Sequence, residues 1–423
     1  MITPATGFVP AIIEGRTRPL VTDPGASLLG DQERRALLAA FDAAAARGGF
    51  EGDEVARFER ELAARIGAAH AIAVSSATTG LQLLLTSAGV GAGAEVLVPA
   101  HTFPASAHAV IHAGARPVFV DVDRDTLCLD PGRVHEAVTE HTRAILVVHI
   151  GGKPARMPEI IDVASRHGLA VVEDAAQAHG ATLAGRHVGT FGLGGVFSFS
   201  PKLMTSFRGG AIVTDDPLIA DRCRQLRFHG FSPEREGAGR QTPGGRRFVH
   251  HVAGYSAAMT ALQAAMLIPQ LGQLEDQVRR RHDNAVRFAA GLASIGGFRP
   301  VPGVQGSRGN YYMLEAFFDP EHFGGLPRDL AAEALLSEGV PVSPVALAHM
   351  LAPDNPSLEH CRAMPHPVAV AFRDEGLVFG HPLQSLFLSG DPSYVTEALE
   401  RVALIKASAD RIAAVSDGTH EAG

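Results

Sequence analysis

The chain has 423 residues, 46% of them hydrophobic, and a formal net charge of −8 at pH 7. This length exceeds the ~250–300 residues that one core usually holds, so we expect two domains. The acidic balance argues against a nucleic-acid partner. No apolar run of about 18 residues occurs and the first 24 residues lack a basic start, which predicts neither a membrane span nor a signal peptide and favours a cytoplasmic protein.

The first half of the chain alternates between helical and extended patterns. Apolar residues at helical spacing predict helices over residues 32–46 and 53–66. Short apolar or β-branched runs then alternate with further helical segments, and the expected strands are residues 71–75, 95–98, 117–122, 144–149, 169–173, 195–199 and 210–214. Because these runs are apolar along their length, they indicate an α/β fold with a doubly wound, mostly parallel sheet.

The pattern changes after residue 227. Residues 233–247 predict a mobile loop, and a long helix is expected over residues 257–291 with an interruption at Pro269. Later elements suggest a smaller α+β domain, with strands near 310–318, 339–342 and 384–388, helices near 327–338 and 393–414, and a disordered tail after Ala414. We therefore divide the chain into an N-terminal arm and helix (1–50), a large α/β domain (51–260), and a linking helix with a small C-terminal domain (261–423).

Only three lysines occur in the chain: Lys153, Lys202 and Lys406. Lys153 lies in a Gly-Gly-Lys-Pro turn and Lys406 on the polar side of a C-terminal helix, and we expect both to be solvated. Lys202 lies between two apolar runs, where burying an ammonium group is costly unless the amine takes part in chemistry. Taken alone, an exposed loop lysine is the simpler interpretation of Lys202.

Ligands of an open parallel sheet bind at the carboxyl ends of its strands. The first strand is followed by Ser76-Ala77-Thr78 at a helix start, which suits a phosphate, although plain helix capping explains these residues equally well. The second strand is followed by Phe103, a ring that stacks on a flat heterocycle or anchors the loop. The strand at 169–173 runs into Asp174, a carboxylate that a protonated pyridine nitrogen would satisfy.

Two other patterns resemble known ligand-binding motifs, but their surroundings argue against that interpretation. Residues 89–93 are glycine-rich but follow a helix and precede a strand, the reverse of a dinucleotide-binding turn. His108 and His112 have the spacing of a zinc-protease helix, but Ala109 takes the place of the required glutamate. The sequence predicts no metal site. A phosphate-binding helix start, a stacking ring, a carboxylate and a lysine on successive strand ends instead match the requirements of pyridoxal 5′-phosphate (PLP).

With these residues the chain resembles the DegT/DnrJ/EryC1/StrS family, the PLP-dependent sugar and cyclitol aminotransferases of fold type I. The resemblance covers about residues 24–414 and is most specific at Val171–Gly180. Residues 98–103, 197–199 and 202–210 also match. Residues 202–205 and 379–392 are most similar to the 3-amino-5-hydroxybenzoate synthase branch. The resemblance implies a fold type I PLP-binding α/β domain followed by a smaller α+β domain.

The resemblance also implies roles for single residues. Lys202 would form the internal aldimine and move the proton, and Asp174 would pair with the pyridine nitrogen. Gln177 would lie near the ring hydroxyl, and Phe103 would stack on the ring. The other implied cofactor contacts are Ala77, Thr78 and Ser198 at the phosphate and Ser256 from segment 254–256, which in this family reaches into the neighbouring site of a dimer.

The chain departs from the family pattern at several positions. Ser198 and Lys202 are four positions apart instead of the usual five. Ser76-Ala77-Thr78 replaces Asn-Gly-Thr, Phe207-Arg208-Gly209-Gly210 replaces Gly-Glu-Gly-Gly, and Ser256-Ala257-Ala258 replaces Asn-x-Arg. We hypothesise that Arg208, which stands where the family has an acid, favours an anionic substrate.

The resemblance implies a homodimeric aminotransferase with shared active sites. It would aminate a cyclic keto substrate, either a nucleotide keto-sugar or a cyclitol, in secondary-metabolite (antibiotic) biosynthesis, with glutamate or glutamine as the amino donor. Two alternatives stay open. One is a PLP-dependent dehydratase or aromatase like 3-amino-5-hydroxybenzoate synthase, and the other is a non-catalytic relative that binds a sugar or the cofactor without turnover.

Overall fold

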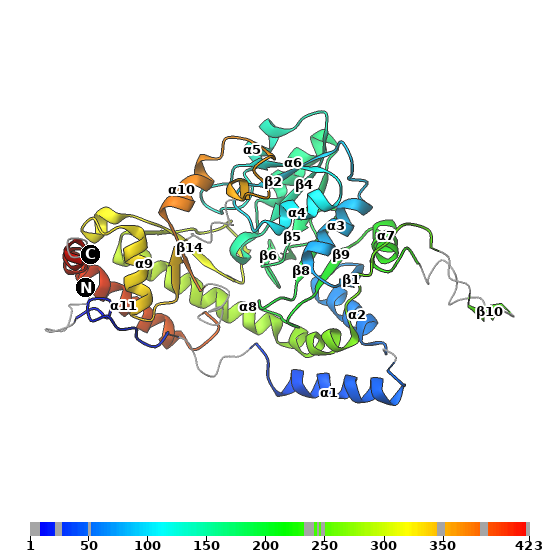
Figure 1. Ribbon diagram of the computed structural model, residues 1–423, viewed down its shortest axis with the longest axis horizontal. Helices are drawn as coiled ribbons and strands as arrows, with labels where there is room; N and C mark the ends of the chain where they lie inside the picture. Colours follow the sequence, from blue (N-terminus) through cyan, green and yellow to red (C-terminus); the bar gives the residue numbers. More distant parts are fainter. Residues whose placement is uncertain are drawn as a thin grey trace.

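An eight-stranded mixed sheet forms the centre of the protein (Figure 1). The computed structural model describes residues 9–21, 28–49, 52–231, 241–242, 245–246, 250–344, 352–380 and 388–419. The sheet order is β1-β9-β8-β5-β4-β2-β3-β16. Its strands are β1 (His70–Val74), β2 (Glu95–Pro99), β3 (Arg116–Val120), β4 (Thr142–Val148), β5 (Ala170–Asp174), β8 (Gly194–Ser198), β9 (Gly210–Thr214) and β16 (Arg362–Ala363).

Most neighbouring strands of this sheet are parallel, as the apolar runs predicted. The exception is β9, which is antiparallel to both β1 and β8. Each of the seven strands expected between residues 71 and 214 is present. The eighth strand, β16, was not expected, because its two residues carry no strand pattern and pair with β3 from far along the chain.

Helices cover both faces of the sheet, since alternate residues of a strand face two different cores. Ile72 of β1 packs with α3 (Ala77–Ser87) and α4 (Ala105–His112), whereas its neighbour Ala73 packs with α2 (Glu54–Ile66) and α8 (Ala261–Ile295). This two-sided covering is the doubly wound α/β arrangement. The remaining helices of the first half are α1 (Asp31–Ala46), α5 (Pro131–Ala137), α6 (Met157–His167) and α7 (Pro217–Arg227), and the 3-10 turn η1 covers Ile150–Gly152.

The long helix α8 is continuous, and the predicted interruption at Pro269 is wrong. A proline removes one helical hydrogen bond, but Leu267 and Leu271 on either side of Pro269 are both buried in the core shared with α2. This packing supports the helix on both sides of the proline. Figure 1 shows α8 running from α11 (Pro392–Ala407) to α2, so that it connects the two ends of the molecule.

A second, antiparallel sheet follows α8, in the order β12-β14-β17-β15. It is covered by α9 (Arg328–Ser337) and α11, which share a second core with it. The strands are β12 (Phe298–Pro300), β14 (Leu314–Phe318), β15 (Val342–Pro344) and β17 (Gly376–Phe379). The predicted small α+β unit is therefore present, although the strand expected at 384–388 falls largely outside the described residues.

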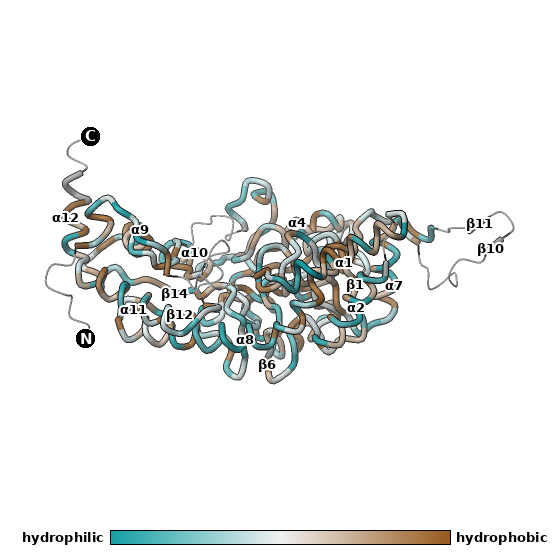
Figure 2. Tube along the Cα trace, turned by 90° about the horizontal axis from the view of Figure 1, so that it is seen from below, coloured by the Kyte–Doolittle hydropathy of each residue, from teal (hydrophilic) through white to brown (hydrophobic). Residues whose placement is uncertain are grey.

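The chain end is helical beyond the predicted boundary. We expected disorder after Ala414, but α12 spans Ala409–Thr419. Its residues Ala409 and Ile412 are buried in the second core, which explains why the helix forms. At the opposite end of the molecule lies the β10–β11 pair (Gln241–Thr242 and Gly245–Arg246), as Figure 2 shows. Most of the predicted mobile loop at 233–247 lies outside the described residues.

Smaller elements complete the described chain. Strands β13 (Ser307–Arg308), β6 (Thr182–Leu183) and β7 (Arg186–His187) form a small sheet of their own, and α10 (Pro367–Glu375) packs on the central core through Phe372. The remaining 3-10 turns are η2 (Pro320–Phe323) and η4 (Ala352–Asp354). Among the described helices, none combines the length and apolarity that a membrane crossing requires. The three cysteines are free thiols. The division at residues 50 and 260 stays a prediction.

Candidate active site

The predicted phosphate-binding residues lie where β1, β8 and β9 meet the start of α3. In the register of the sheet, Gly210 lies opposite Ser198 of β8 on one side and Val74 of β1 on the other. Gly209 forms a further bridge with Ser76, the residue before α3. A Cβ atom at Gly210 would lie 2.6 Å from the Ala77 nitrogen, so only glycine allows this close approach. The fold thus brings Ser198, Gly210 and the start of α3 together.

The start of α3 suits an anion. Ser76 caps the helix by accepting a 3.1 Å hydrogen bond from the Thr79 N–H group. The amides of Ala77 and Thr78 come first in the helix and therefore have no acceptor within it. Such amides and the helix dipole together favour a phosphate at this position. The binding of a phosphate by Ala77, Thr78 and Ser198 remains a prediction.

Asp174 ends β5 and is 7% exposed. Its Oδ2 atom accepts a 2.8 Å hydrogen bond from the Ser106 hydroxyl, and its Oδ1 atom accepts one of 3.1 Å from the Ala176 N–H group. Burial raises the pKa of Asp174, while the hydrogen bond from Ser106 and the charge of Lys202 oppose this rise. A buried carboxylate with only two hydrogen bonds retains acceptor capacity for a cationic partner.

A short chain of hydroxyl groups links the residue before Phe103 to Asp174. Ser106 uses its proton on Asp174, so the Thr102 hydroxyl, 3.0 Å away, donates to Ser106. The neighbouring Phe103 ring is 52% exposed at the carboxyl end of β2. Its stacking on a cofactor ring stays a prediction. The sequence analysis missed Ser106, because a serine inside an apolar helix carries no signal of its own.

Lys202 is partly buried, as the sequence predicted, and its Nζ atom lies 5.5 Å from the centre of the Tyr312 ring. Burial lowers the pKa of Lys202, and the negative charge of Asp174 opposes this effect. A lowered pKa leaves more of the amine neutral, which is the form that attacks an aldehyde. Tyr312 was not singled out from the sequence, because it belongs to a segment more than a hundred residues away.

His149 and Glu173 support the end of β5 from behind. The Nδ1 atom of His149 accepts a 3.1 Å hydrogen bond from the Ala155 N–H group, so Nε2 carries the proton and donates to Glu173 over 3.0 Å. Glu173 also accepts hydrogen bonds from the amides of Gly189 and Gly192. Because Glu173 precedes Asp174, this buried network fixes the strand end that carries the site. A polar pair at two neighbouring strand ends was the signal available in the sequence.

Gln177 lies just beyond Asp174. Its Oε1 atom accepts a 2.8 Å hydrogen bond from the Gly151 N–H group, which leaves its NH₂ group as a donor. Ser256 is exposed and pairs with Phe228, and the next residue, Ala257, accepts a hydrogen bond from the Ser75 N–H group. Ser256 is thus held beside the start of α3. Its predicted reach into a neighbouring subunit remains a prediction.

Two lysines that we expected to be solvated are not. Lys153 is 1% exposed and forms an ion pair with Glu315 of β14. The sequence could not indicate this pair, because the partners are 162 positions apart and meet only when the two sheets pack. Lys406 is half-buried and donates hydrogen bonds to the Ile295 and Gly296 carbonyls, so it caps the end of α8.

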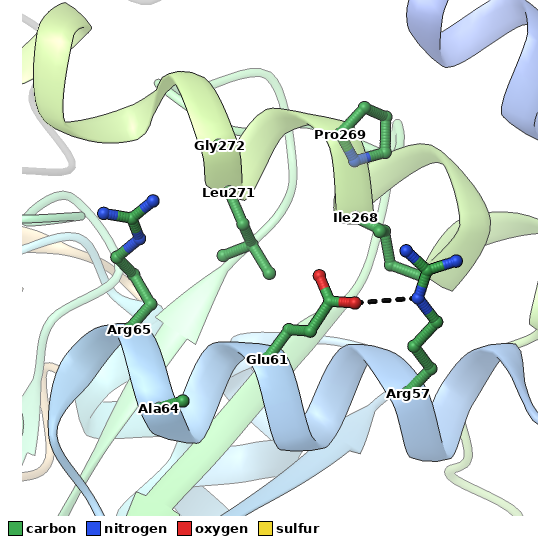
Figure 3. Close-up of a pocket in the computed structure, with 8 residues that line it drawn as sticks. All are labelled: Arg57, Glu61, Ala64, Arg65, Ile268, Pro269, Leu271 and Gly272. Atoms are coloured by element: carbon green, nitrogen blue, oxygen red, sulfur yellow. Dashed lines mark hydrogen bonds and ion pairs between the residues drawn. The ribbon is translucent and has the colours of Figure 1, made fainter.

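A surface pocket of about 620 Å³ lies elsewhere, between α2 and α8 (Figure 3). One side carries the Arg57–Glu61 ion pair, with 2.7 Å between the Nε and Oε1 atoms. The other side is formed by Leu271 and its neighbours around Pro269. None of the predicted site residues lines this pocket. The site predicted from the sequence therefore lies apart from this pocket.

A doubly wound α/β sheet with a sheltered lysine and a buried carboxylate at adjoining strand ends defines a fold type I enzyme. The chain belongs to the DegT/DnrJ/EryC1/StrS aminotransferase family, whose family model matches residues 31–361. The resemblance stated from the sequence is thereby confirmed, and with it the α/β fold and the aminotransferase class. This family and its PLP-bound structures imply PLP as the cofactor.

Individual relatives support the same assignment. L-glutamine:2-deoxy-scyllo-inosose aminotransferase of Streptomyces kanamyceticus is 40% identical over 305 residues, which cover 70% of each chain. The structure of 3-amino-5-hydroxybenzoic acid synthase aligns with a TM-score of 0.77 at 29% identity, covering 92% of this chain and 99% of the other. S. venezuelae DesV aligns with a TM-score of 0.74 at 32% identity, covering 92% and 98%.

Proposed function

We propose that this aminotransferase holds PLP on Lys202 and uses it to transfer an amino group from glutamine or glutamate to a cyclitol ketone. The observation that carries the proposal is the meeting of Lys202, Asp174 and the Ser198–Gly210 strand pair at one edge of the sheet. The family supplies the reaction type, and the site supplies the residues. The biosynthesis of an antibiotic or related secondary metabolite is the proposed setting.

The residues present fit the cofactor. Gly210 lies against the Ala77 amide with no room for a side chain, which leaves a cradle of backbone N–H groups for a phosphate. Asp174 has acceptor capacity for the pyridine nitrogen, and Phe103 offers an exposed ring. When bound, PLP supplies an aldehyde for an amine and a ring that withdraws electrons from the reacting carbon. The NH₂ group of Gln177 is a donor for an oxygen on that ring.

The side chains then divide the work. Lys202 would hold the aldehyde through its neutral amine, and its Nζ atom, when free, would take up and return the proton of the reacting carbon. The carboxylate of Asp174 favours a protonated pyridine nitrogen. Its ionised form is in turn favoured by the hydrogen bond from Ser106. The His149–Glu173 pair keeps water-free packing behind these groups, since both side chains are fully buried.

The substrate class is inferred from the relatives. The Streptomyces kanamyceticus relative is named for an inosose, a cyclic ketone rich in hydroxyl groups, and for L-glutamine as the donor. We propose the same classes of acceptor and donor for this chain. An inosose is uncharged, so the hypothesis that Arg208, which is exposed, favours an anionic acceptor is the alternative to this class and stays a proposal.

A homodimer with shared sites is part of the proposal. Large apolar side chains are exposed around the site: Phe207 is 62% and Tyr255 42% exposed, and Phe103 lies nearby. Exposed aromatic residues around a polar site are typical of a protein interface. Ser256 follows Tyr255 and would then contact the partner's cofactor. Light scattering of the purified protein at micromolar concentration checks the dimer, and a monomer that is active at the same concentration would contradict it.

The central experiment uses the purified protein with added PLP. Borohydride reduction followed by peptide mapping should place the cofactor on Lys202, and Lys202→Met should retain none after reduction. Addition of L-glutamine should convert the cofactor to its amine form, and 2-deoxy-scyllo-inosose should reverse the change. A dehydratase would not convert the cofactor to its amine form with L-glutamine. A non-catalytic relative would not make this conversion either, and it would show no visible band of bound PLP. Either result would overturn the proposed function.

A further inference from the structure

Two segments from distant parts of the chain are joined directly behind the site. Asn310 N–H donates to the Gly152 carbonyl over 3.0 Å, and Met313 N–H donates to the Gly151 carbonyl over 3.3 Å. The Asn310 side chain continues this connection by donating to the carbonyls of Gln177 and His179 over 2.9 and 3.0 Å. Residues 310–315 are therefore docked on the 151–153 turn and on the segment that follows Asp174.

The Lys153–Glu315 ion pair joins the last residue of the docked segment to the 151–153 turn. Both side chains are almost fully buried. Glu315 uses Oε2 for Lys153, whereas its Oε1 atom is buried and has no hydrogen-bond partner among the described residues. A buried ion pair that is not fully hydrogen-bonded adds little net stability compared with an apolar pair of similar size. Stability alone therefore does not explain why two charges lie here.

The 151–153 turn is shaped to receive the carboxylate. Gly151 has a φ of +63°, and a Cβ atom at this position would lie 2.4 Å from Glu315 Oε1. The carboxylate thus packs directly on the backbone of the residue whose N–H group holds Gln177. One short segment connects the ion pair to a predicted cofactor contact.

Tyr312 lies between the two anchors of the docked segment. Its N–H group donates to the Asn310 side chain over 2.8 Å, and Glu315 follows three residues later. The ring is buried, and its centre lies 5.5 Å from Lys202 Nζ. The other titratable groups whose charges act on Lys202 or respond to it are Asp174 and His179. Tyr312 is thus the described ring that stands over this amine.

We propose that Lys153 and Glu315 are positioning residues that hold Tyr312 against the Lys202 amine and so keep water away from it. The pair acts through the docked segment 310–315 and touches neither the amine nor the substrate. The proposal rests on the proposed role of Lys202. A purely structural pair would change the stability of the fold without changing the chemistry of Lys202.

The test measures Lys202 itself in the apoprotein. Competitive acetylation across a range of pH, read by mass spectrometry, gives a titration midpoint for each lysine, and the chain has only three. Tyr312→Ala should admit water and raise the midpoint of Lys202 by about one pH unit, which is a tenfold loss of neutral amine at neutral pH. Tyr312→Phe should leave the midpoint unchanged. Lys406, on α11, is the internal reference.

The ion-pair variants decide the proposal. Lys153→Met and Glu315→Gln should each raise the Lys202 midpoint in the same direction, and neither should raise it further in a Tyr312→Ala background. If a single variant fails to fold, the reversed pair Lys153→Glu with Glu315→Lys should restore the parent midpoint. Folded Lys153 and Glu315 variants with an unchanged Lys202 midpoint would overturn the proposal. So would a further shift of the midpoint when these variants are made in the Tyr312→Ala background.

The two proposals can fail separately. Reduction of PLP onto Lys202 in a protein whose ion-pair variants leave the midpoint unchanged would support the function and reject the positioning role. If the ion-pair variants shift the Lys202 midpoint in a protein that never binds PLP, the positioning role is supported and the proposed function is rejected.

Discussion

Ser106 Oγ donates a 2.8 Å hydrogen bond to Asp174 Oδ2, and the two residues are 68 positions apart in the chain. The bond connects the start of α4 to the end of β5. It stabilises the ionised form of a carboxylate whose burial favours the neutral form. The serine therefore tunes the group that we expect to hold the pyridine nitrogen.

Ser106→Ala should weaken the retention of PLP. Loss of a hydrogen bond to a charged group typically costs about 1.5–3 kcal/mol, so we expect roughly a tenfold or greater rise in the dissociation constant. An absorbance titration of the apoprotein measures it. Ser87→Ala is the matched control, because that serine faces Cys223 and not the site. Equal affinities of the Ser106 variant and the parent would contradict the role given to Ser106.

Asp174→Asn should stabilise the apoprotein at neutral pH. Burial raises the pKa of Asp174 above its ordinary value of 3.8. Between that value and the higher folded-state pKa, the folded protein binds more protons than the unfolded chain, so stability falls as pH rises. An amide removes this cost, and the gain should be present at pH 7 and vanish below about pH 4.

Denaturant unfolding at both pH values measures this gain. Asp42→Asn is the control, since Asp42 is exposed on α1. The Asp174 variant should also lose its affinity for PLP. A variant that is less stable than the parent at pH 7 would mean that the hydrogen bonds of the carboxylate outweigh its burial.

Gly210→Ala should damage phosphate binding specifically. The new Cβ atom would lie 2.6 Å from the Ala77 nitrogen, so β9 and the start of α3 must separate. We expect the affinity for PLP to fall at least about tenfold, and the affinity for pyridoxal, which lacks the phosphate, to change much less. A parallel loss for both compounds would show that the glycine does not shape a phosphate site.

Gly272→Ala provides the matched control for that substitution. Gly272 lies in the interior of α8, and a Cβ atom there meets nothing within 4 Å. Alanine is the better helix former, so this variant should gain about 0.5–1 kcal/mol of stability and bind PLP like the parent.

Phe207→Gly should be more stable than Phe207→Ala. Phe207 has a φ of +66°, a conformation that is costly for residues with a Cβ atom. The glycine of the family pattern at this position suits that backbone, and the ring is largely exposed in the described chain. We expect a difference of about 1 kcal/mol in the free energy of unfolding. If Phe207→Ala unfolds at the same or a higher denaturant concentration than Phe207→Gly, the backbone at this position is not strained.

Several features of the candidate site could be predicted because short stretches of sequence indicate them. The apolar run before Asp174 indicates a buried strand that ends in a carboxylate, and the Ser76-Ala77-Thr78 triplet marks a helix start. The scarcity of lysine drew attention to Lys202, but its role as the cofactor lysine rests on the family resemblance and stays a prediction. These signals lie within a few residues of the feature that they predict, so one sequence is enough to read them.

Other features depended on which segments meet. The sequence predicted a break at Pro269, but α8 continues through it with Leu267 and Leu271 buried on either side. It predicted a solvated Lys153, but β14 brings Glu315 to the amine and excludes water. The supporting groups Ser106 and Tyr312 had no local signal, since each acts on a residue far away in the chain.

The sequence by itself determined the order of strands and helices in the large sheet and the strand ends that carry polar groups. Hydrophobic periodicity and strand-end chemistry are local, and they do not depend on the partner across the sheet. Only the tertiary structure decided that the Tyr312 ring lies over Lys202 and that Lys153 and Glu315 form a buried ion pair. Burial and charge pairing are properties of the space between elements, and that space exists only after the two sheets have packed.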